Sequence, residues 1–294
     1  MTVSSKKKRK TKKPIATHES SVSPKGARRG HKNDQRTSLK EMQSSSAATR
    51  TAREPRKVKD DAYVPPGAVT STTIGELIRG IREIPEEHQG RFGITPEGGS
   101  GVKIWMAGDA SLVRLPCVAI VGSRNVSGEG ASRARRLARE LAAAGIVVVS
   151  GLAKGVDTEA LNAAIGANGR TIGVIGTPLT RAYPAENKRL QEKLYREHLL
   201  ISQFPPEKRV YPSNFPERNK LMAAISDATV IIEASDESGS LHQAAECTRL
   251  GRWLFIAKSV AENPSLRWPK DFLRYSTTRV LINTSEILQV LRAN

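Results

Sequence analysis

From residue 117 onward, short apolar runs alternate with longer stretches that are apolar on one side only. Several of the apolar runs have the length of a strand, and they lie at 117–121, 146–149, 171–175, 199–202, 229–232 and 253–257. They are apolar at nearly every position, which is typical of strands buried on both faces in a parallel sheet that helices cover. A last strand at 280–282 and a helix at 285–292 close the pattern.

Helical periodicity fills the intervals between the strands. Residues 130–144 place Ala134, Leu137 and Leu141 on one face, and Gly145 follows, a residue type common just after a helix. The regular alternation predicts an α/β fold, with a Rossmann-like, doubly wound, mostly parallel sheet. Later intervals repeat the helical pattern around Leu161, Leu190, Leu221 and Leu241.

The chain before residue 117 has a different composition. Residues 1–60 hold 18 Lys and Arg against 5 Asp and Glu, and they contain few large apolar residues. Such a segment cannot bury enough surface to fold alone, so it is predicted to be a disordered basic arm. Residues 61–116 carry a short helical pattern and a strand-like piece at 102–106. They are predicted to form a small N-terminal extension that packs on the Rossmann-like domain of residues 117–294.

Composition and charge narrow the class of protein. The formal net charge is +18, and the run 6–10 is typical of a nucleic-acid or targeting patch, although a tail that only raises solubility fits it equally well. Cys117 and Cys247 lie in apolar surroundings outside any paired motif, which predicts a reduced, disulfide-free, cytoplasmic protein. The sequence has neither a signal-like segment nor an apolar run of about 18 residues, so no secretion and no membrane span are predicted.

Small and basic residues follow several of the predicted strands. In an open α/β sheet, ligands bind outside the carboxyl ends of the strands, where helix N-termini favour anions. Glycines let a backbone approach a ligand, cations neutralise phosphate, and Phe215 offers a ring on which a base can stack. Each feature alone is also typical of a plain turn, a solvated helix start or a core ring, but together they predict a phosphate-binding groove. Its candidate residues are Gly122, Ser123, Arg124, Gly151, Lys154, Gly155, Asn214, Phe215, Arg218, Asn219, Lys220, Gly239 and Ser240.

Motifs of nucleotide enzymes are missing from this sequence. The glycines after residue 121 do not fit GxGxxG, and neither GxxxxGKS nor GxxxxGKT occurs, which argues against a dinucleotide oxidoreductase and a P-loop ATPase. His198 and His242 have no partner at metal-ligand spacing, and the serines lack an obvious Asp–His pair. Glu246 is expected to be a surface charge. The sequence therefore predicts a binding protein with no catalysis, no cofactor and no metal site.

The stretches that carry a family resemblance run in order along about half of the chain. They lie at 105–109, 118–124, 149–157, 170–176, 183–187, 202–206, 214–219 and 238–241. In order and spacing they resemble the DNA-processing protein A family, also called Smf, which is known from natural transformation and not for turnover of a substrate. The resemblance implies an extended Rossmann-like fold, binding of single-stranded DNA, loading of the RecA recombinase onto it, and homodimerisation. It also implies that Ser123 and Arg124 hold DNA phosphates, that residues of the 151–155 loop line the pocket, and that residues of the 214–220 segment complete it.

The chain also departs from the family pattern. Members often carry a basic residue just before the Asn-Phe-Pro element, whereas this sequence has Tyr-Pro-Ser at 211–213, with Arg209 as the nearest cation. His242 and Gln243 stand where a small and β-branched run is usual, and Lys258 begins a pair that replaces Pro-Gly. The helical and winged-helix domains of longer members are expected to be absent, which indicates a short or divergent member.

Two alternatives stay open. A nucleotide-binding sensor or phosphoribohydrolase of the LOG superfamily, which shares a Rossmann-like fold, would carry Pro-Gly-Gly-x-Gly-Thr-x-x-Glu near the fifth strand. The corresponding stretch here, 237–243, lacks the expected acidic residue, which argues against hydrolysis but not against nucleotide sensing. In the other alternative the fold is a scaffold, and the arm alone binds nucleic acid without specificity.

Overall fold

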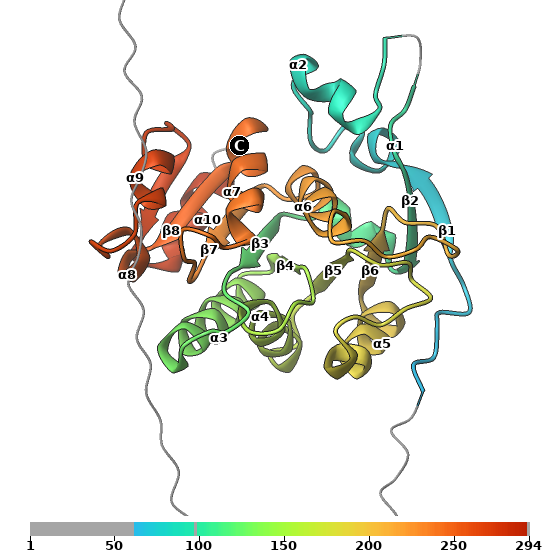
Figure 1. Ribbon diagram of the computed structural model, residues 1–294, viewed down its shortest axis with the longest axis horizontal. Coiled ribbons are helices and arrows are strands. Elements are labelled where there is room, and N and C mark those ends of the chain that lie inside the picture. Colours follow the sequence, from blue (N-terminus) through green and yellow to red (C-terminus); the bar gives the residue numbers. More distant parts are fainter. Residues whose placement is uncertain (1–61, 97–98, 293–294) are drawn as a thin grey trace, which may run out of the picture. The chain divides into compact units, whose positions relative to one another are not determined.

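A mixed β-sheet forms the centre of the molecule (Figure 1). The computed structural model describes residues 62–96 and 99–292. Within these residues, nine strands pair in the order β1-β2-β6-β5-β4-β3-β7-β8-β9; β1 and β2 run antiparallel to their neighbours and the other pairs are parallel. The predicted α/β, Rossmann-like, mostly parallel sheet is thereby confirmed. The strands are β1 (Thr70–Thr73), β2 (Lys103–Gly108), β3 (Cys117–Val121), β4 (Val147–Ser150), β5 (Thr171–Ile175), β6 (Leu199–Ser202), β7 (Ala228–Ile231), β8 (Trp253–Ala257) and β9 (Thr278–Leu281).

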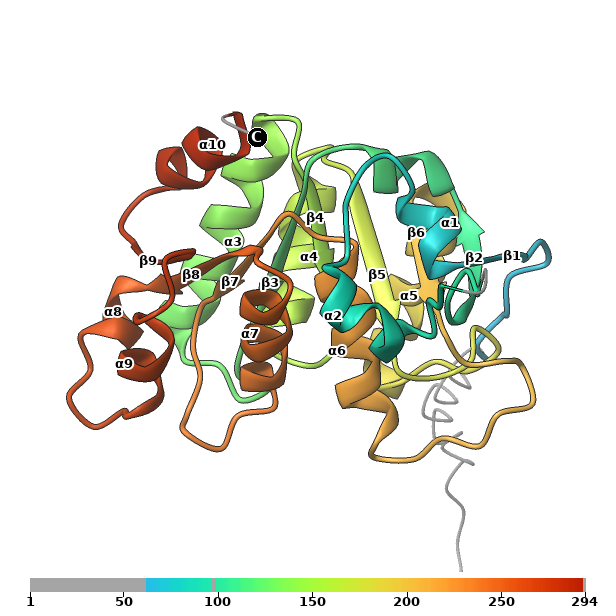
Figure 2. The same ribbon diagram turned by 90° about the horizontal axis from the view of Figure 1, so that it is seen from above.

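Helices cover both faces of the sheet. In Figure 1, α3, α4 and α5 lie on one face, and α6 and α7 lie on the other. Seen from above in Figure 2, α8 and α9 lie at one end of the sheet, and β1 and β2 at the other. The helices are α1 (Ile74–Ile78), α2 (Glu86–Gln89), α3 (Gly128–Ala143), α4 (Val156–Gly166), α5 (Lys188–Glu197), α6 (Asn214–Ala224), α7 (Ser240–Arg249), α8 (Lys258–Ala261), α9 (Trp268–Phe272) and α10 (Thr284–Arg292).

The core is built from strand residues that point alternately to the two faces. On β3, Val118 and Ile120 pack among residues of α3, including Leu137 and Leu141. Its other residues, such as Ala119, join the cluster that includes α6 and α7. Every residue of β3 is buried, which explains why the sequence shows no polar alternation there. Burying one Leu or Ile contributes about 1.5–3 kcal/mol, so the apolar packing on the two faces of the sheet is the main source of stability.

The segment before β3 joins the same sheet, because β2 pairs with β6. Arg82 anchors it to the core through four hydrogen bonds. Its Nε and Nη2 donate to the Asp227 carboxylate at 2.8 and 2.7 Å, and its Nη1 and Nη2 donate to the carbonyl oxygens of Val113 and Leu115. Asp227 also accepts the Cys117 N–H at 2.7 Å. The predicted domain boundaries stay predictions, and the arm at 1–60 lies outside the described residues.

The two cysteines are buried and free. Burial raises the pKa of both the Cys117 and the Cys247 thiol to about 12, so neither forms the reactive thiolate near neutral pH. Among the described residues, we find no helix with the length and apolar character needed to cross a membrane.

Strand order reverses between β3 and β7. The chain steps from β3 through β4 and β5 to β6 on one side, then returns to place β7 and β8 on the other. Such a switch point separates the loops that leave the carboxyl ends of the two central strands, and it creates a crevice suited to a ligand. The loop after β3 and the loop after β7 therefore frame the candidate site.

Candidate functional site

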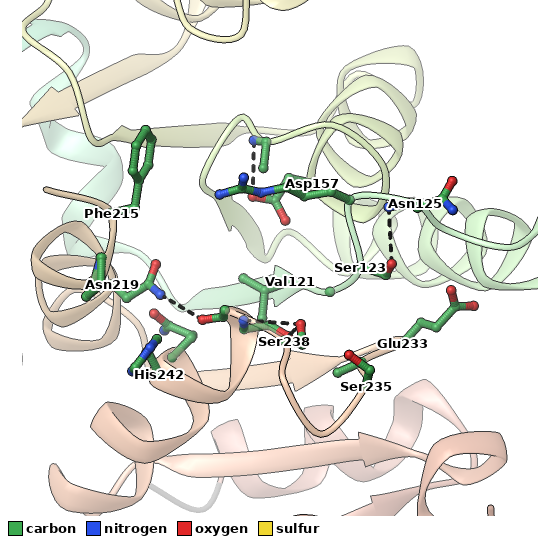
Figure 3. A pocket seen from close by; sticks show the side chains of 18 of the residues that line it. Val121, Ser123, Asn125, Asp157, Phe215, Asn219, Glu233, Ser235, Ser238 and His242 are labelled. Carbon is green, nitrogen blue, oxygen red and sulfur yellow. Dashed lines mark hydrogen bonds between the residues drawn. The ribbon is translucent and has the colours of Figure 1, made fainter. Parts of the chain in front are cut away.

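A cavity of about 1180 Å³ lies at the switch point, outside the carboxyl ends of β3 and β7 (Figure 3). Its walls come from the β3–α3 loop, the loop that leads into α6, and the β7–α7 loop. Its polar and aromatic lining residues include Ser123, Arg124, Asn125, Arg133, Asp157, Tyr183, Tyr211, Phe215, Arg218, Asn219, Glu233, Ser235, Ser238, Ser240 and His242.

The structure brings only part of the predicted groove to this cavity. The predicted residues that line it are Gly122, Ser123, Arg124, Phe215, Arg218, Asn219, Gly239 and Ser240. Lys154 instead forms an exposed ion pair with Glu186. Lys220 binds Glu217 at 2.7 Å and lines a smaller cavity. The remaining predicted residues, Gly151, Gly155 and Asn214, lie outside the set that lines the larger cavity.

Arg124 is exposed on the β3–α3 loop, and hydrogen bonds of the neighbouring Ser123 fix the conformation of this loop. The Ser123 N–H donates to the Glu233 carbonyl oxygen at 2.7 Å, and the Ser123 Oγ accepts the Asn125 N–H at 3.1 Å. The Ser123 carbonyl oxygen accepts the Val156 N–H at 3.2 Å. The Ser123 hydroxyl proton is left to donate to a ligand, and Arg124 stands exposed beside it.

Gly155, the residue just before α4, allows the 151–155 loop to approach the β3–α3 loop closely. Gly155 has a φ of +75°, and a Cβ at this position would lie 2.3 Å from the Ser123 carbonyl oxygen. Any other residue would therefore push the β3–α3 loop away. The sequence predicted that this glycine lines the ligand pocket, whereas the structure places it in contact with the neighbouring loop.

Two buried side chains of opposite charge line the floor of the cavity. Asp157 and Arg218 are both buried, and the Asp157 carboxylate accepts the N–H groups of Gly151 and Ala153 at 3.1 and 3.3 Å. Arg218 Nη1 donates to the Val174 carbonyl oxygen at 3.0 Å. Burial raises the pKa of Asp157, opposed by the Arg218 charge, and burial lowers the pKa of Arg218, opposed by Asp157. Arg218 thus fixes the floor of the cavity from α6.

The Arg218 side chain passes close to the backbone at Gly151. A Cβ at this position would lie 1.3 Å from Arg218 Nη1, so only glycine leaves room for the guanidinium. The Asn214 amide similarly ties α6 to the sheet, because it donates to the Gly176 carbonyl oxygen at 3.2 Å. These residues of the predicted groove shape the cavity from behind.

Aromatic rings gather on one side of the cavity. The Phe215 ring packs against Gly176, stands 5.4 Å from the Tyr183 ring centroid to centroid, and lies 5.8 Å below the Arg124 guanidinium. Because neighbours cover much of Phe215, the more exposed rings are Tyr183 and Tyr211, at 50% and 45%. Sequence reasoning did not assign either tyrosine to the site, although Tyr183 begins one of the stretches that carry the family resemblance.

Arg209 is the nearest cation before the Asn-Phe-Pro element. Its guanidinium lies 5.7 Å from the Tyr211 ring, on the segment that leads into α6. Both side chains are exposed. The nearest cation to the Asn-Phe-Pro element therefore stacks on a ring at the rim of the cavity.

The N-terminus of α7 also faces the cavity. Ser238 and Ser240 are joined through their hydroxyls at 2.7 Å, and the Asn219 amide donates to the Gly239 carbonyl oxygen at 3.3 Å. The first turn of α7 contains no acidic residue. Its positive dipole end, and the one hydroxyl proton that this pair leaves over, therefore remain available to an anion.

Carboxylates near the cavity are engaged with the chain itself. Glu233 accepts hydrogen bonds from Ser127, and Asp157 accepts two backbone N–H groups. Glu246 was expected at the surface, but it is buried and pairs with Arg91 and Arg249, both at 2.7 Å. Across residues 62–96 and 99–292, we find no cluster of three or more His, Cys, Asp or Glu side chains able to hold a metal ion.

Comparison with known proteins decides the family. The profile of the family described as DNA recombination-mediator protein A matches residues 99–292. The chain belongs to this family. Among its relatives, DNA processing protein DprA of Streptococcus pneumoniae is 39% identical over 154 residues, which make up 52% of this chain and 54% of that protein. DprA of Bacillus subtilis is 37% identical over 147 residues, half of each chain.

Solved structures of DprA have the same fold. The X-ray structure of the Streptococcus pneumoniae protein superimposes with a TM-score of 0.62 at 30% identity, and covers 76% of this chain and 74% of that one. DprA from Helicobacter pylori, for which a single-stranded DNA binding mode has been described, superimposes with a TM-score of 0.60 at 25% identity. It covers 76% of this chain and 96% of that one. The chain spans about half the length of the curated relatives it matches.

Proposed function

We propose that this member of the DNA recombination-mediator protein A family binds single-stranded DNA in the cavity at the switch point. The observation that carries the proposal is the grouping of exposed Arg124, exposed Tyr183 and Tyr211, and the open N-terminus of α7 around one cavity. Cations and helix N-termini hold phosphates, while aromatic rings stack unpaired bases of any sequence. The binding mode described for Helicobacter pylori DprA supports the same ligand.

The proposed strand makes two kinds of contact. Arg124 and the Ser123 hydroxyl hold backbone phosphates, and the hydroxyl pair at the start of α7 holds another. Tyr183 and Tyr211 stack bases next to these phosphate contacts, because the Phe215 ring lies between the Arg124 guanidinium and the Tyr183 ring. A duplex keeps its bases stacked inside, so it cannot use the tyrosines.

We further propose that the cavity binds and does not catalyse. Its carboxylates, Asp157 and Glu233, are engaged with backbone N–H and hydroxyl groups of the chain, which supports a structural role for both. Loading of RecA onto the strand, assembly as a homodimer and a cytoplasmic location are proposed on the family relationship alone.

Arg124→Ala should weaken binding of an oligothymidine by about tenfold or more, because a charge-assisted hydrogen bond to phosphate contributes about 1.5–3 kcal/mol. It should also reduce the slope of log K against log salt by about 0.7, the share of one phosphate on a single strand. Fluorescence anisotropy at several salt concentrations measures both. Arg274→Ala is the control, since Arg274 is exposed and pairs only loosely with Asp271 at 3.9 Å. Equal losses in the two variants would contradict the assignment.

Tyr183→Ala should lower the affinity for single-stranded DNA by about tenfold and leave duplex affinity unchanged, because one stacked base contributes about 1–3 kcal/mol. Its salt slope should match that of the unmodified protein. Tyr275 offers a matched control: it is 52% exposed, against 50% for Tyr183, and it also contacts a phenylalanine, with a centroid distance of 6.3 Å. If Tyr275→Ala weakens binding as much as Tyr183→Ala does, or if duplex affinity falls in parallel, the proposed single-strand site is wrong.

A further inference from the structure

The carboxylate of Glu233 occupies the N-terminus of α3. Glu233 follows β7, and its Oε1 accepts the Ser127 N–H at 3.0 Å while its Oε2 accepts the Ser127 hydroxyl at 2.6 Å. Ser127 is the N-cap of α3, and its Oγ in turn accepts the Gly130 N–H at 3.0 Å. The Glu233 carboxylate therefore occupies the N-terminus of α3, the helix that follows β3.

The fit around this carboxylate is close. A Cβ on Gly130 would lie 2.4 Å from Glu233 Oε2, so the first turn of α3 has a glycine where the carboxylate approaches it. Figure 3 shows Glu233 on the side of the cavity where Ser123 and Asn125 lie, across from Phe215. The position is the one at which doubly wound folds hold the phosphates of a bound nucleotide. Here that position is already filled.

The N-terminus of α7, which also faces the cavity, differs from that of α3 because no carboxylate of the described residues occupies it. The first turn of α7 contains no acidic residue; the Ser240 hydroxyl lies in it, and the Ser238 hydroxyl lies just before it. Of these two helix N-termini, that of α3 is neutralised by the Glu233 carboxylate and that of α7 is left open. A terminal phosphate carries up to two negative charges and meets repulsion from Glu233, whereas a phosphodiester of a strand carries one and can lie against Arg124 and α7.

We propose that Glu233 is a specificity-determining residue, which keeps the terminal phosphate of a free nucleotide off α3 and so reserves the cavity for the interior of a strand. The inference rests on the proposed function, because it concerns the same cavity. It assigns the selectivity to a side chain that the sequence pattern did not single out.

The test compares the full-length protein with Glu233→Ala and Glu237→Gln by calorimetric titration with inorganic phosphate and with deoxyadenosine monophosphate. Glu237 is an exposed carboxylate on the same β7–α7 loop and provides the control for loss of one negative charge. Glu233→Ala should bind both ligands at least about tenfold more tightly than the unmodified protein, because the N–H and hydroxyl of Ser127 become free for phosphate. Glu237→Gln should bind them no better than the unmodified protein.

A folded Glu233→Ala protein that binds phosphate no better than the unmodified one overturns the proposal, as does an equal gain in Glu237→Gln. If Glu233→Ala does not fold, Glu233→Gln replaces it; this variant loses the charge but keeps the shape, so a gain of about threefold is expected and no gain overturns the proposal. Oligothymidine binding by the unmodified protein is measured in parallel. Its failure contradicts the proposed function, whereas failure of the phosphate gain contradicts only the role of Glu233.

Discussion

Replacing Arg218 by methionine is expected to lower the free energy of unfolding by about 1–3 kcal/mol at neutral pH, because the buried Asp157 carboxylate loses the nearby opposite charge. The Val174 carbonyl oxygen loses its donor as well. Methionine keeps most of the volume of the arginine stem, so the loss is mainly electrostatic. Urea unfolding followed by circular dichroism measures the change.

The loss should depend on pH in a defined direction. Burial raises the pKa of Asp157, and without Arg218 nothing of opposite charge counters the rise. The native state then binds a proton more readily than the unfolded state does, so the free energy of unfolding increases as the pH falls. Arg218→Met should therefore lose most stability near pH 7 and regain part of it near pH 5. Adding Asp157→Asn to the variant should restore stability at pH 7; a loss that is independent of pH and unchanged by Asp157→Asn would show that the charge pair is not the cause.

Arg82→Met should cost about 3–5 kcal/mol for a related reason in a different place. Arg82 is buried and makes four hydrogen bonds, two of them to Asp227. Without the guanidinium, Asp227 keeps the Cys117 N–H as its hydrogen-bond donor and the charge of Arg252 nearby. The same urea titration measures the loss. Arg79→Met is the control, because Arg79 lies nearby on an exposed surface and pairs only with Glu76; such a pair contributes about 0–1 kcal/mol.

Comparison of the losses in Arg82→Met and Arg79→Met tests whether the buried ion pair holds the extension to the core. A large loss in Arg82→Met with little change in Arg79→Met supports an extension that is held to the core by one buried ion pair. Similar small losses in both variants would mean that the sheet pairing of β2 with β6 suffices to hold the extension, and the role assigned to Arg82 would be wrong.

The fold could be predicted from the sequence because its signal is local. Each central strand is buried along its whole length and apolar at most positions, and the long helix α3 repeats its apolar residues at helical spacing. Strand β1 has the sequence TSTT, and α8 and α9 are one turn long, so no such signal marks them. Their structure depends on packing against elements far away in the chain.

The site was harder to predict than the fold. Arg124 could be found because it is a cation in a short turn of small residues between a predicted strand and a predicted helix. Arg218 and Asp157 belong to different helices, and the sequence does not reveal that the pair is buried; an arginine at a helix start has the same sequence signal whether it faces solvent or the core. Tyr183 begins one of the stretches that carry the family resemblance, and Glu233 follows a predicted strand, but neither position indicates that the side chain faces a cavity. Convergence is a property of tertiary packing.

The central pairing of β3 with β7 has a consequence for how the protein is made. The Cys117 N–H and the Asp227 carboxylate that join these strands are 110 residues apart. A nascent chain synthesised only as far as Ile225 contains β3 and its loop but has no β7 beside it, so it exposes an apolar strand edge and half of the cavity. Contacts so distant in sequence form slowly. The cavity lining extends as far as Leu266, so the nascent protein acquires a complete cavity only after β7, α7 and the segment up to this residue have been synthesised.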